Sequence, residues 1–377
     1  GLEGSSAEWR GRFLDLIREG VHRRAGDGVK VGAFLSGGLD SSTVTGMLSQ
    51  LGEGPARTYT IGFDAPGYDE MEYARLVSRH FNTDHHEYYV TAEDVLAAVP
   101  QIAAHFDQPF AVSSAVPAYY CARMAKETGV QLLLAGDGGD ELFGGNERYA
   151  KQQLFTWYSH LPGPLRRGLI EPLLRSPLGE LGPMRKAASY VRQASMPMPE
   201  RMESYNLLER LGPRQVLTDA AMARVDTGGP LQLLRETYHG ARAGHMLNRM
   251  LAVDMRITLA DRDLPKVTGA CGLAGIEVDF PFLDDDLVAF SALLPPREKL
   301  RRLRLRHLFK EAVRGFLPDE VLTKKKQGFG LPFGLWLVEH PGLREFTHET
   351  LAGLKRRDLV RPEFIEELLG NRHAQHA

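Results

Sequence analysis

Cysteine is scarce in this 377-residue chain, and long apolar runs are missing. The two cysteines, Cys121 and Cys271, lie 150 positions apart without a CxxC pair, so neither a disulfide scaffold nor a structural zinc cluster is available. No apolar stretch approaches 18 residues, and residues 1–5 lack the basic and apolar regions of a signal peptide. These absences predict a cytoplasmic protein that neither enters a membrane nor is exported.

The chain also lacks an excess of either charge, since 46 Lys and Arg face 48 Asp and Glu, for a net charge of −2. This balance gives no global attraction to nucleic acid or to an anionic membrane. Glycine and proline are too few for a low-complexity chain, which excludes disorder and fibre as the main state. The length is sufficient for two or three domains with a sizeable core.

The first 134 residues alternate between apolar runs and segments with helical spacing. Ser5 and Glu8 form a capping-box pattern ahead of the first helical segment. Strands separated by helices predict an α/β fold with a doubly wound, mostly parallel sheet, which binds ligands at the carboxyl ends of its strands. Helices are predicted at 6–24, 41–51, 69–81, 92–105 and 115–128, and strands at 29–35, 58–63, 86–90 and 131–134.

The pattern changes after residue 149. Up to residue 262, Leu, Met, Ala, Arg and Glu recur at helical spacing, and prolines interrupt them. The sequence therefore predicts an α/β core at 1–150 and a helical part at 151–377 that packs on it and completes the site. Further helices are predicted at 245–259, 284–294, 304–316 and 362–369.

The string Ser-Gly-Gly-Leu-Asp-Ser-Ser at 36–42 joins the first predicted strand to the next helix. Its glycines permit a tight turn, and the free amides at the start of the helix suit an anion such as a phosphate. The carboxylate of Asp40 is suited to a Mg²⁺ ion that bridges phosphate oxygens. The Walker motif is absent, which excludes a lysine-cradled NTPase.

A second glycine-rich string, Gly-Asp-Gly-Gly-Asp-Glu at 136–141, follows the strand at 131–134. Its three carboxylates repel one another unless a cation, a lysine or a positive reaction centre lies nearby. A dinucleotide-binding GxGxxG motif fails because Glu141 occupies the last glycine position. The DxDxDG spacing of a calcium loop is not met either.

Two basic runs occur later in the chain. Lysines 324–326 precede Gln-Gly-Phe-Gly, and the acidic loop's need for a cation indicates that one of them turns inward. The run at 297–307 is predicted to be the solvated start of a helix. His85 and His86 lack metal-ligand spacing and are predicted to be ordinary surface or strand-edge residues.

Together these strings resemble a known family. The string at 36–42 is similar to the SGGxDS pyrophosphate loop of N-type ATP pyrophosphatases. The others narrow the resemblance to the synthetase domain of glutamine-dependent asparagine synthetases: 136–141 is similar to its acidic loop, Pro-Phe-Leu-Asp at 281–284 to its PFLD motif, and 326–329 to its Lys-x-x-Phe loop. The resemblance extends from about residue 8 to 340 and implies an adenine nucleotide alpha-hydrolase-like fold.

The resemblance implies an ATP-dependent carbon-nitrogen ligase with Mg²⁺. A carboxylate, such as the β-carboxylate of aspartate, attacks the α-phosphate of ATP to give an acyl-adenylate and pyrophosphate, and ammonia then displaces AMP. Lys326 is implied to stabilise charge on the α-phosphate, and Asp137 to assist the amine as a base. Asp40 and Asp140 are implied to hold Mg²⁺, with Asp140 alternatively holding Lys326. The implied ATP contacts are Leu35, Ser36, Gly37, Gly38, Asp40, Ser41, Ser42, Ile61 and Gly136.

Three departures from the family pattern matter. The glutaminase domain with its N-terminal cysteine nucleophile is absent from this sequence, so the chain alone is not expected to hydrolyse glutamine, and a glutaminase domain or subunit or another source supplies ammonia. The family strings Lys-Val-Asp-Arg and Glu-Val-Arg read Lys-Val-Thr-Gly at 266–269 and Glu-Val-Asp at 277–279, so two arginines are missing and the acid substrate is open. Asp137 stands where many members have Glu.

Three alternatives stay open at this point. β-Lactam synthetases and peptide cyclases of similar fold use an internal amine. A tRNA-modifying pyrophosphatase would share the 36–42 loop, although the lack of a CxxC pair argues against a thiolating version. The third alternative is a catalytically impaired module that binds partners. The sequence identifies neither the acid substrate nor the amine acceptor, and it does not show whether the chain forms a homo-oligomer.

Overall fold

The computed structural model describes residues 3–26, 28–52, 54–65, 68, 70–109, 112–175, 182–324 and 330–370. The chain forms two compact units, each described by itself below. Unit 1 contains residues 1–145 and 254–344, and unit 2 contains residues 146–253 and 345–377. The predicted division at residue 150 stays a prediction.

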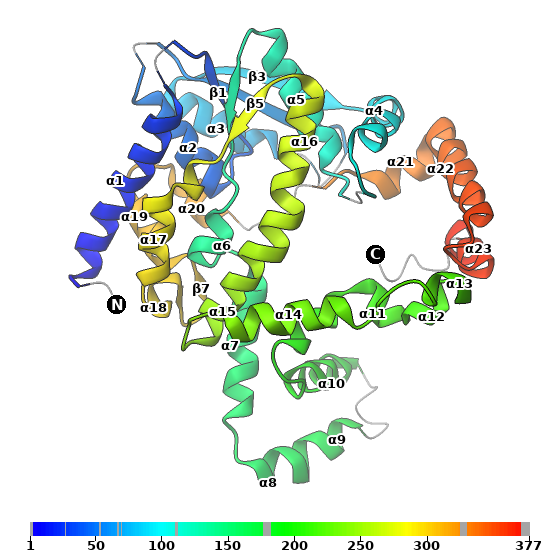
Figure 1. Cartoon of the computed structure of the whole chain (residues 1–377). Coiled ribbons are helices and arrows are strands. Elements are labelled where there is room, and N and C mark those ends of the chain that lie inside the picture. Colours follow the sequence, from blue (N-terminus) through cyan, green and yellow to red (C-terminus); the bar gives the residue numbers. More distant parts are fainter. Residues whose placement is uncertain are drawn as a thin grey trace. The chain divides into compact units, whose positions relative to one another are not determined.

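A parallel five-stranded sheet in the order β3-β2-β1-β4-β5 forms the centre of unit 1 (Figure 1). The chain order reverses between β1 and β4, which is where open α/β sheets bind ligands. The predicted α/β class is confirmed, but the fifth strand was not predicted. The strands are β1 (Val31–Phe34), β2 (Arg57–Phe63), β3 (Asp84–Val90), β4 (Leu132–Leu134) and β5 (Glu277–Asp279).

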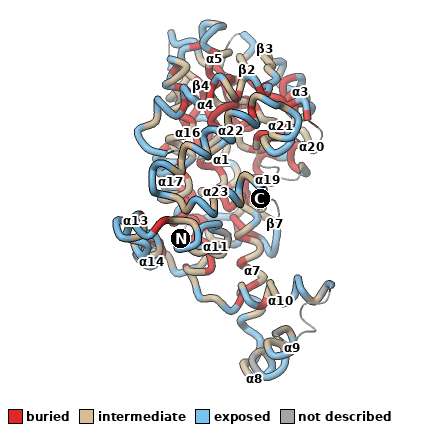
Figure 2. The backbone as a smooth tube through the Cα atoms, turned by 90° about the vertical axis from the view of Figure 1, so that its right-hand side faces the viewer, coloured by how far each residue is buried: buried red, intermediate tan, exposed pale blue. Residues whose placement is uncertain are grey.

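Helices cover both faces of this sheet because successive strand side chains point to opposite sides. Leu134 packs into one core with Phe13 and Phe309, whereas Leu133 packs into the other with Tyr59 and Ala122. Figure 2 shows many buried residues in this unit, and they lie in the sheet and in the helices that cover it. The first core contains residues of α1 (Ser6–Arg24), α2 (Leu39–Ser49), α3 (Met71–Phe81), α17 (Asp285–Leu293), α19 (His307–Ala312) and α20 (Asp319–Thr323); the second contains residues of α4 (Ala92–His105), α5 (Ala115–Glu127), α16 (Leu264–Ala274) and α21 (Phe333–Glu339).

Local sequence signals account for the best-predicted helices. In α1 the Ser5 hydroxyl accepts from the Glu8 amide at 3.3 Å, and the Glu8 carboxylate accepts from the Ser5 amide at 2.6 Å. The same reciprocal capping starts α4 at Thr91. The predicted bounds of both helices are confirmed, and the other predicted α/β elements differ by a few residues at their ends.

The predicted helix at 304–316 is wrong at both ends, because the helix α19 begins at His307 and ends at Ala312. A short hairpin of β6 (Leu300–Arg301) and β7 (Arg304–Leu305) precedes α19, and Arg302 and Arg306 have left-handed backbone with φ of 58° and 54°. Left-handed backbone cannot continue an α-helix. The other elements of unit 1 are α6 (Gly139–Phe143), the π-helix η4 (Asp254–Asp263), η5 (Pro281–Leu283) and α18 (Pro296–Lys299).

Unit 2 is helical over its described residues, as predicted for this stretch. Its exposed apolar side chains include Trp157 and Leu169. No helix among the described residues of either unit is long and apolar enough to cross a membrane. The elements are α7 (Glu147–Ser159), α8 (Gly163–Leu165), η1 (Arg166–Ile170), α9 (Glu171–Arg175), α10 (Gly182–Ala194), η3 (Glu200–Tyr205), α11 (Leu207–Leu211), α12 (Pro213–Val216), α13 (Asp219–Met222), α14 (Gly229–Gly240), α15 (Met246–Val253), the end of α22 (Pro341–Leu354), η6 (Lys355–Arg357) and α23 (Pro362–Leu369).

Candidate active site

The loop between β1 and α2 carries the first motif. Gly37 has φ of 65°, and a Cβ there would lie 2.5 Å from the Tyr73 carbonyl carbon, so only glycine fits. Gly38 is the N-cap of α2, whose first amides are therefore open to an anion. The hydroxyls of Ser36 and Ser41 lie 3.0 Å apart and close the loop on itself.

The acidic loop follows β4, the neighbour of β1. Because both strands run in the same direction, their carboxyl ends bring the two loops together at one edge of the sheet. A Cβ on Gly136 would lie 2.8 Å from the Ser41 amide nitrogen, and one on Gly139 would overlap the Asp40 carboxylate. Glycine at these two positions therefore lets the acidic loop touch the first motif.

Arg306 lies between the carboxylates of the two loops. Its Nη1 donates to both oxygens of Asp40 at 2.7 Å, and its Nη2 donates to Oδ1 of Asp140. The Arg306 side chain is only 7% exposed. The predicted solvated helix start at 297–307 is wrong for this residue, because the β6-β7 hairpin turns it inward. Buried Lys299, from the same basic run, is a second departure from that prediction.

A cavity of about 430 Å³ opens beside these loops. Leu35 and Ile61 supply apolar surface suited to a flat base, and the two loops supply its polar wall. Gly37 does not line the cavity, and Ser42 is fully buried, with an Oγ that has no hydrogen-bond partner among the described residues. The predicted residues that line the cavity are Leu35, Ser36, Gly38, Asp40, Ser41, Ile61, Gly136, Asp137 and Asp140.

Asp137 shares the cavity with a charged pair that was not among the predicted site residues. Lys266 and Asp263 both line the cavity, and their charged atoms lie 3.6 Å apart. Burial raises the pKa of Asp137 to about 6, and the charge of Lys266 opposes that shift. Lys266 belonged to the string quoted at 266–269, but nothing local indicated that it faces Asp137.

Lys324 is the member of the lysine run that turns inward among the described residues. Its Nζ lies 3.2 Å from Oε1 of Glu70 and 3.4 Å from the Ser36 carbonyl oxygen, and 4.4 Å from the centre of the Tyr73 ring. Burial lowers its pKa, and Glu70 opposes that change. Lys326, the predicted catalytic lysine, lies outside the described residues.

The donors at Asp40 and Asp140 fit a magnesium ion. Among the described residues no cluster of three His, Cys, Asp or Glu side chains could hold a metal alone. Mg²⁺ usually takes one or two carboxylates and completes its shell with water and substrate phosphates. Asp40 and Asp140 supply two carboxylates next to a phosphate-type loop, but both bind Arg306, so a Mg²⁺ ion there would have to displace the guanidinium from their oxygens.

Comparison with known proteins shows which family this chain is similar to. A family model described as asparagine synthase matches residues 12–377. Asparagine synthetase [glutamine-hydrolyzing] 1 of Bacillus subtilis is 25% identical over 365 residues, covering 96% of this chain and 56% of the relative. A putative asparagine synthetase [glutamine-hydrolyzing] of Mycobacterium bovis is 27% identical over 360 residues, covering 92% and 51%. The chain thus spans about half the length of these relatives.

Other matches are less extensive. A putative asparagine synthetase [glutamine-hydrolyzing] 2 of Methanocaldococcus jannaschii is 38% identical over 152 residues, which cover 40% of this chain and 29% of the relative. Among solved structures, the U34-tRNA thiolase NcsA from Methanococcus maripaludis with its [4Fe-4S] cluster matches with a TM-score of 0.28 and 14% identity, covering 72% of this chain and 92% of that chain.

Proposed function

The chain belongs to the asparagine synthase family, and we propose that it is an ATP-dependent ligase that activates an aspartate-like carboxylate and transfers it to ammonia. The observation that supports this most is the shared cavity. A phosphate-type loop, two carboxylates suited to Mg²⁺ and Asp137, which has a raised pKa, all line it.

In the first step, a carboxylate oxygen of the acid attacks the α-phosphate of ATP, and the bond to pyrophosphate breaks. The open amides at the start of α2 and the Ser36 and Ser41 hydroxyls are suited to hold the leaving pyrophosphate. Asp40 and Asp140 would hold Mg²⁺, which supplies positive charge to the phosphate oxygens. Lys326 is proposed to stabilise charge on the α-phosphate.

In the second step, the amine nitrogen attacks the acyl carbon, AMP leaves, and the nitrogen loses a proton. Asp137 is proposed to accept that proton. A pKa of about 6 leaves this carboxylate ionised at neutral pH, yet basic enough to act as a proton acceptor. The charge of Lys266 lowers the pKa of Asp137 and would help keep this carboxylate ionised.

Ammonia is the proposed acceptor, and its source is a proposal too. The names of the matched relatives include glutamine hydrolysis, and this chain spans about half their length. A glutaminase domain or subunit is therefore the proposed supplier of ammonia.

A pyrophosphate-release screen tests the proposal. The protein is incubated with ATP, Mg²⁺ and a panel of carboxylic acids, each with and without ammonia. We expect one acid class to trigger release, and with that acid labelled by ¹⁸O in its carboxylate, we expect AMP to carry one labelled oxygen. Unlabelled AMP would contradict an acyl-adenylate intermediate. No pyrophosphate release with any acid of the panel would contradict the proposed ligase activity.

The same screen separates the alternatives. Amide or ring formation without ammonia would replace the proposal with a ligase that uses an internal amine. Salt-sensitive tRNA binding with tRNA-dependent pyrophosphate release would favour a tRNA-modifying enzyme. Unchanged release by Lys326→Ala would overturn the site assignment.

A further inference from the structure

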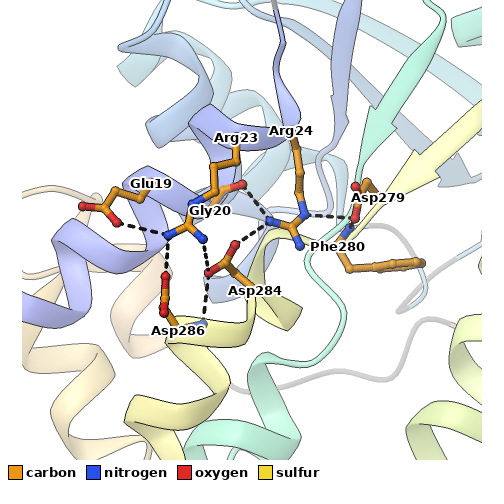
Figure 3. Close-up of polar contacts among 8 residues, drawn as sticks. All are labelled: Glu19, Gly20, Arg23, Arg24, Asp279, Phe280, Asp284 and Asp286. Carbon is orange, nitrogen blue, oxygen red and sulfur yellow. Dashed lines mark hydrogen bonds and ion pairs between the residues drawn. The ribbon is translucent and has the colours of Figure 1, made fainter.

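Arg24, the last residue of α1, joins the carboxylates of Asp279 and Asp284 (Figure 3). Its Nε donates to Oδ1 of Asp279 at 2.9 Å, and its Nη1 donates to Oδ2 of Asp284 at 3.0 Å. Nη1 also donates to the Gly20 carbonyl oxygen at 3.0 Å, which fixes the guanidinium against its own helix. Neither carboxylate lines the cavity, so this group does not contact a ligand bound there.

The Arg24 contacts hold a turn that packs directly on α1. A Cβ on Gly20 would lie 2.9 Å from the Pro281 carbonyl oxygen and 3.3 Å from Cβ of Asp284, so the helix and η5 approach at backbone distance. The Asp284 side chain is 5% exposed and also caps α17 by accepting from the Asp286 amide. A carboxylate this buried requires a cation partner.

The other side of the same turn touches the acidic loop. Gly138, with φ of 99°, lies so close to Leu283 that a Cβ would sit 2.5 Å from the leucine Cδ2. Gly138 is adjacent to Asp137, so a shift of the turn would move the carboxylate that lines the cavity.

A second route to the loop runs through the backbone of β5. The carbonyl oxygen of Asp279 accepts from the Ala135 amide at 2.9 Å, while its carboxylate binds Arg24 and accepts from the Phe280 amide at 2.6 Å. Ala135 is two residues before Asp137. Arg24 thus reaches the acidic loop along both β5 and the turn at 281–284.

We propose that Arg24 is a positioning residue for the reaction: held between Asp279 and Asp284, its guanidinium sets the place of the loop that carries Asp137. The proposal rests on the proposed function for its kinetic consequences, and on the contacts alone for its structural ones. Arg24 is not a catalytic residue, because it does not line the cavity.

The neighbouring Arg23 provides a matched control. It is the same residue type on the same helical turn and also contacts acidic groups, with Nη2 2.7 Å from Asp286 and Nη1 3.3 Å from Asp284. However, its side chain is 47% exposed, against 17% for Arg24, its pair with the exposed Asp286 is screened by water, and its distance to Asp284 is longer, 3.3 Å against 3.0 Å.

The kinetic test compares Arg24→Ser with Arg23→Ser. Loss of these partly buried, charge-assisted contacts should lower kcat of the Arg24 variant by about tenfold while KM for ATP changes less than about threefold. Arg23→Ser should keep both constants. Equal effects of the two substitutions, or a loss confined to KM, would overturn the proposal.

A relocated guanidinium gives the sharper result. Position 279 and Asp284 flank one guanidinium in the structure, so an arginine at 279 can reach Asp284 from the strand. We expect Arg24→Ser combined with Asp279→Arg to recover kcat to within about threefold of the parent. A double variant with a kcat no higher than that of Arg24→Ser would refute the idea that a guanidinium between positions 279 and 284 positions the loop. If Arg24→Ser does not fold, Arg24→Lys, which keeps the charge but not the fork, should show the same selective fall in kcat.

Hydrogen–deuterium exchange separates this proposal from the ligase. In Arg24→Ser, amides at 135–143 should exchange about tenfold faster than in the parent chain, whereas Arg23→Ser should leave them unchanged. This holds even if no acid triggers pyrophosphate release. Unchanged exchange at 135–143 would overturn the positioning role whatever the chain's activity.

Discussion

Replacing Arg306 with methionine tests the charge balance at the centre of the site. The substitution keeps an unbranched side chain of similar length but leaves Asp40 and Asp140 facing each other without their shared guanidinium. Breaking a buried ion pair by removing one partner costs about 3–5 kcal/mol. Each of the two aspartate side chains is 21% exposed, so water recovers part of this loss, and we expect a cost near the lower end, about 3 kcal/mol.

Magnesium should reverse this loss in the variant. An ion held by both carboxylates would restore positive charge where the guanidinium lay, and at a hundred times its Kd it would stabilise the folded state by about 2.7 kcal/mol. In the parent chain Mg²⁺ competes with Arg306 for the same oxygens, so its stabilisation should be smaller.

Urea unfolding, followed by circular dichroism across a Mg²⁺ titration at constant ionic strength, measures both quantities. Arg304→Met, at an exposed position of the same hairpin, is the matched control and should change stability by less than about 0.5 kcal/mol. Equal stabilisation of the parent and the Arg306 variant by Mg²⁺ would refute the idea that arginine and metal share one place. A loss of less than about 1 kcal/mol in the free energy of unfolding of Arg306→Met would refute the proposed charge balance between Arg306 and the two aspartates.

Three further outcomes follow from the same structure. Because the pKa of Asp137 is raised to about 6 in the folded chain, ionising this carboxyl lowers the stability of the fold as the pH rises from about 4 to 6. Asp137→Asn should therefore be more stable than the parent by up to about 3 kcal/mol at pH 8, with no gain below pH 4. Thermal unfolding at both pH values measures this difference, and a difference that does not change with pH would contradict the reasoning. At Gly37 an alanine would need left-handed backbone and would also clash with the main chain of Tyr73, whereas at Gly129, with φ of 82°, its Cβ would lie in open space. Gly37→Ala should therefore lower the free energy of unfolding, measured in urea, by about 2 kcal/mol or more beyond the loss for Gly129→Ala. Equal losses would contradict the close approach at Gly37. Lys324→Met removes the cation that touches the Ser36 carbonyl and Glu70, and should raise KM for ATP about tenfold with a smaller change in kcat, an expectation that an unchanged KM would contradict.

Local chemistry determined how much of the fold could be predicted. Helices α1 and α4 have reciprocal caps and a clear apolar stripe, and both were located with correct bounds. β5 is only three residues long and exists through its pairing with β4, about 140 residues earlier, so periodicity gives no signal for it. The hairpin ahead of α19 has no signal in the sequence, because an arginine does not indicate left-handed backbone.

The site was predictable where its residues are contiguous. Glycines and carboxylates in the sequence indicate the loops at 36–42 and 136–141. Repulsion among the three carboxylates of the acidic loop also indicates that a cation lies nearby. The identity of that cation was not predicted, since Arg306 lies in a run that looked solvated and is 266 positions from Asp40. Lys266 was missed for the same reason.

The return of residues 254–344 to unit 1 has a consequence for synthesis on the ribosome. β4 keeps an unpaired edge until β5 emerges about 140 residues later, on the order of ten seconds at typical elongation rates. Arg306, which binds Asp40 and Asp140 in the folded chain, emerges later still. The first 145 residues therefore leave the ribosome as an unfinished sheet with an open edge, and chaperones that shield such edges have a defined window in which to act.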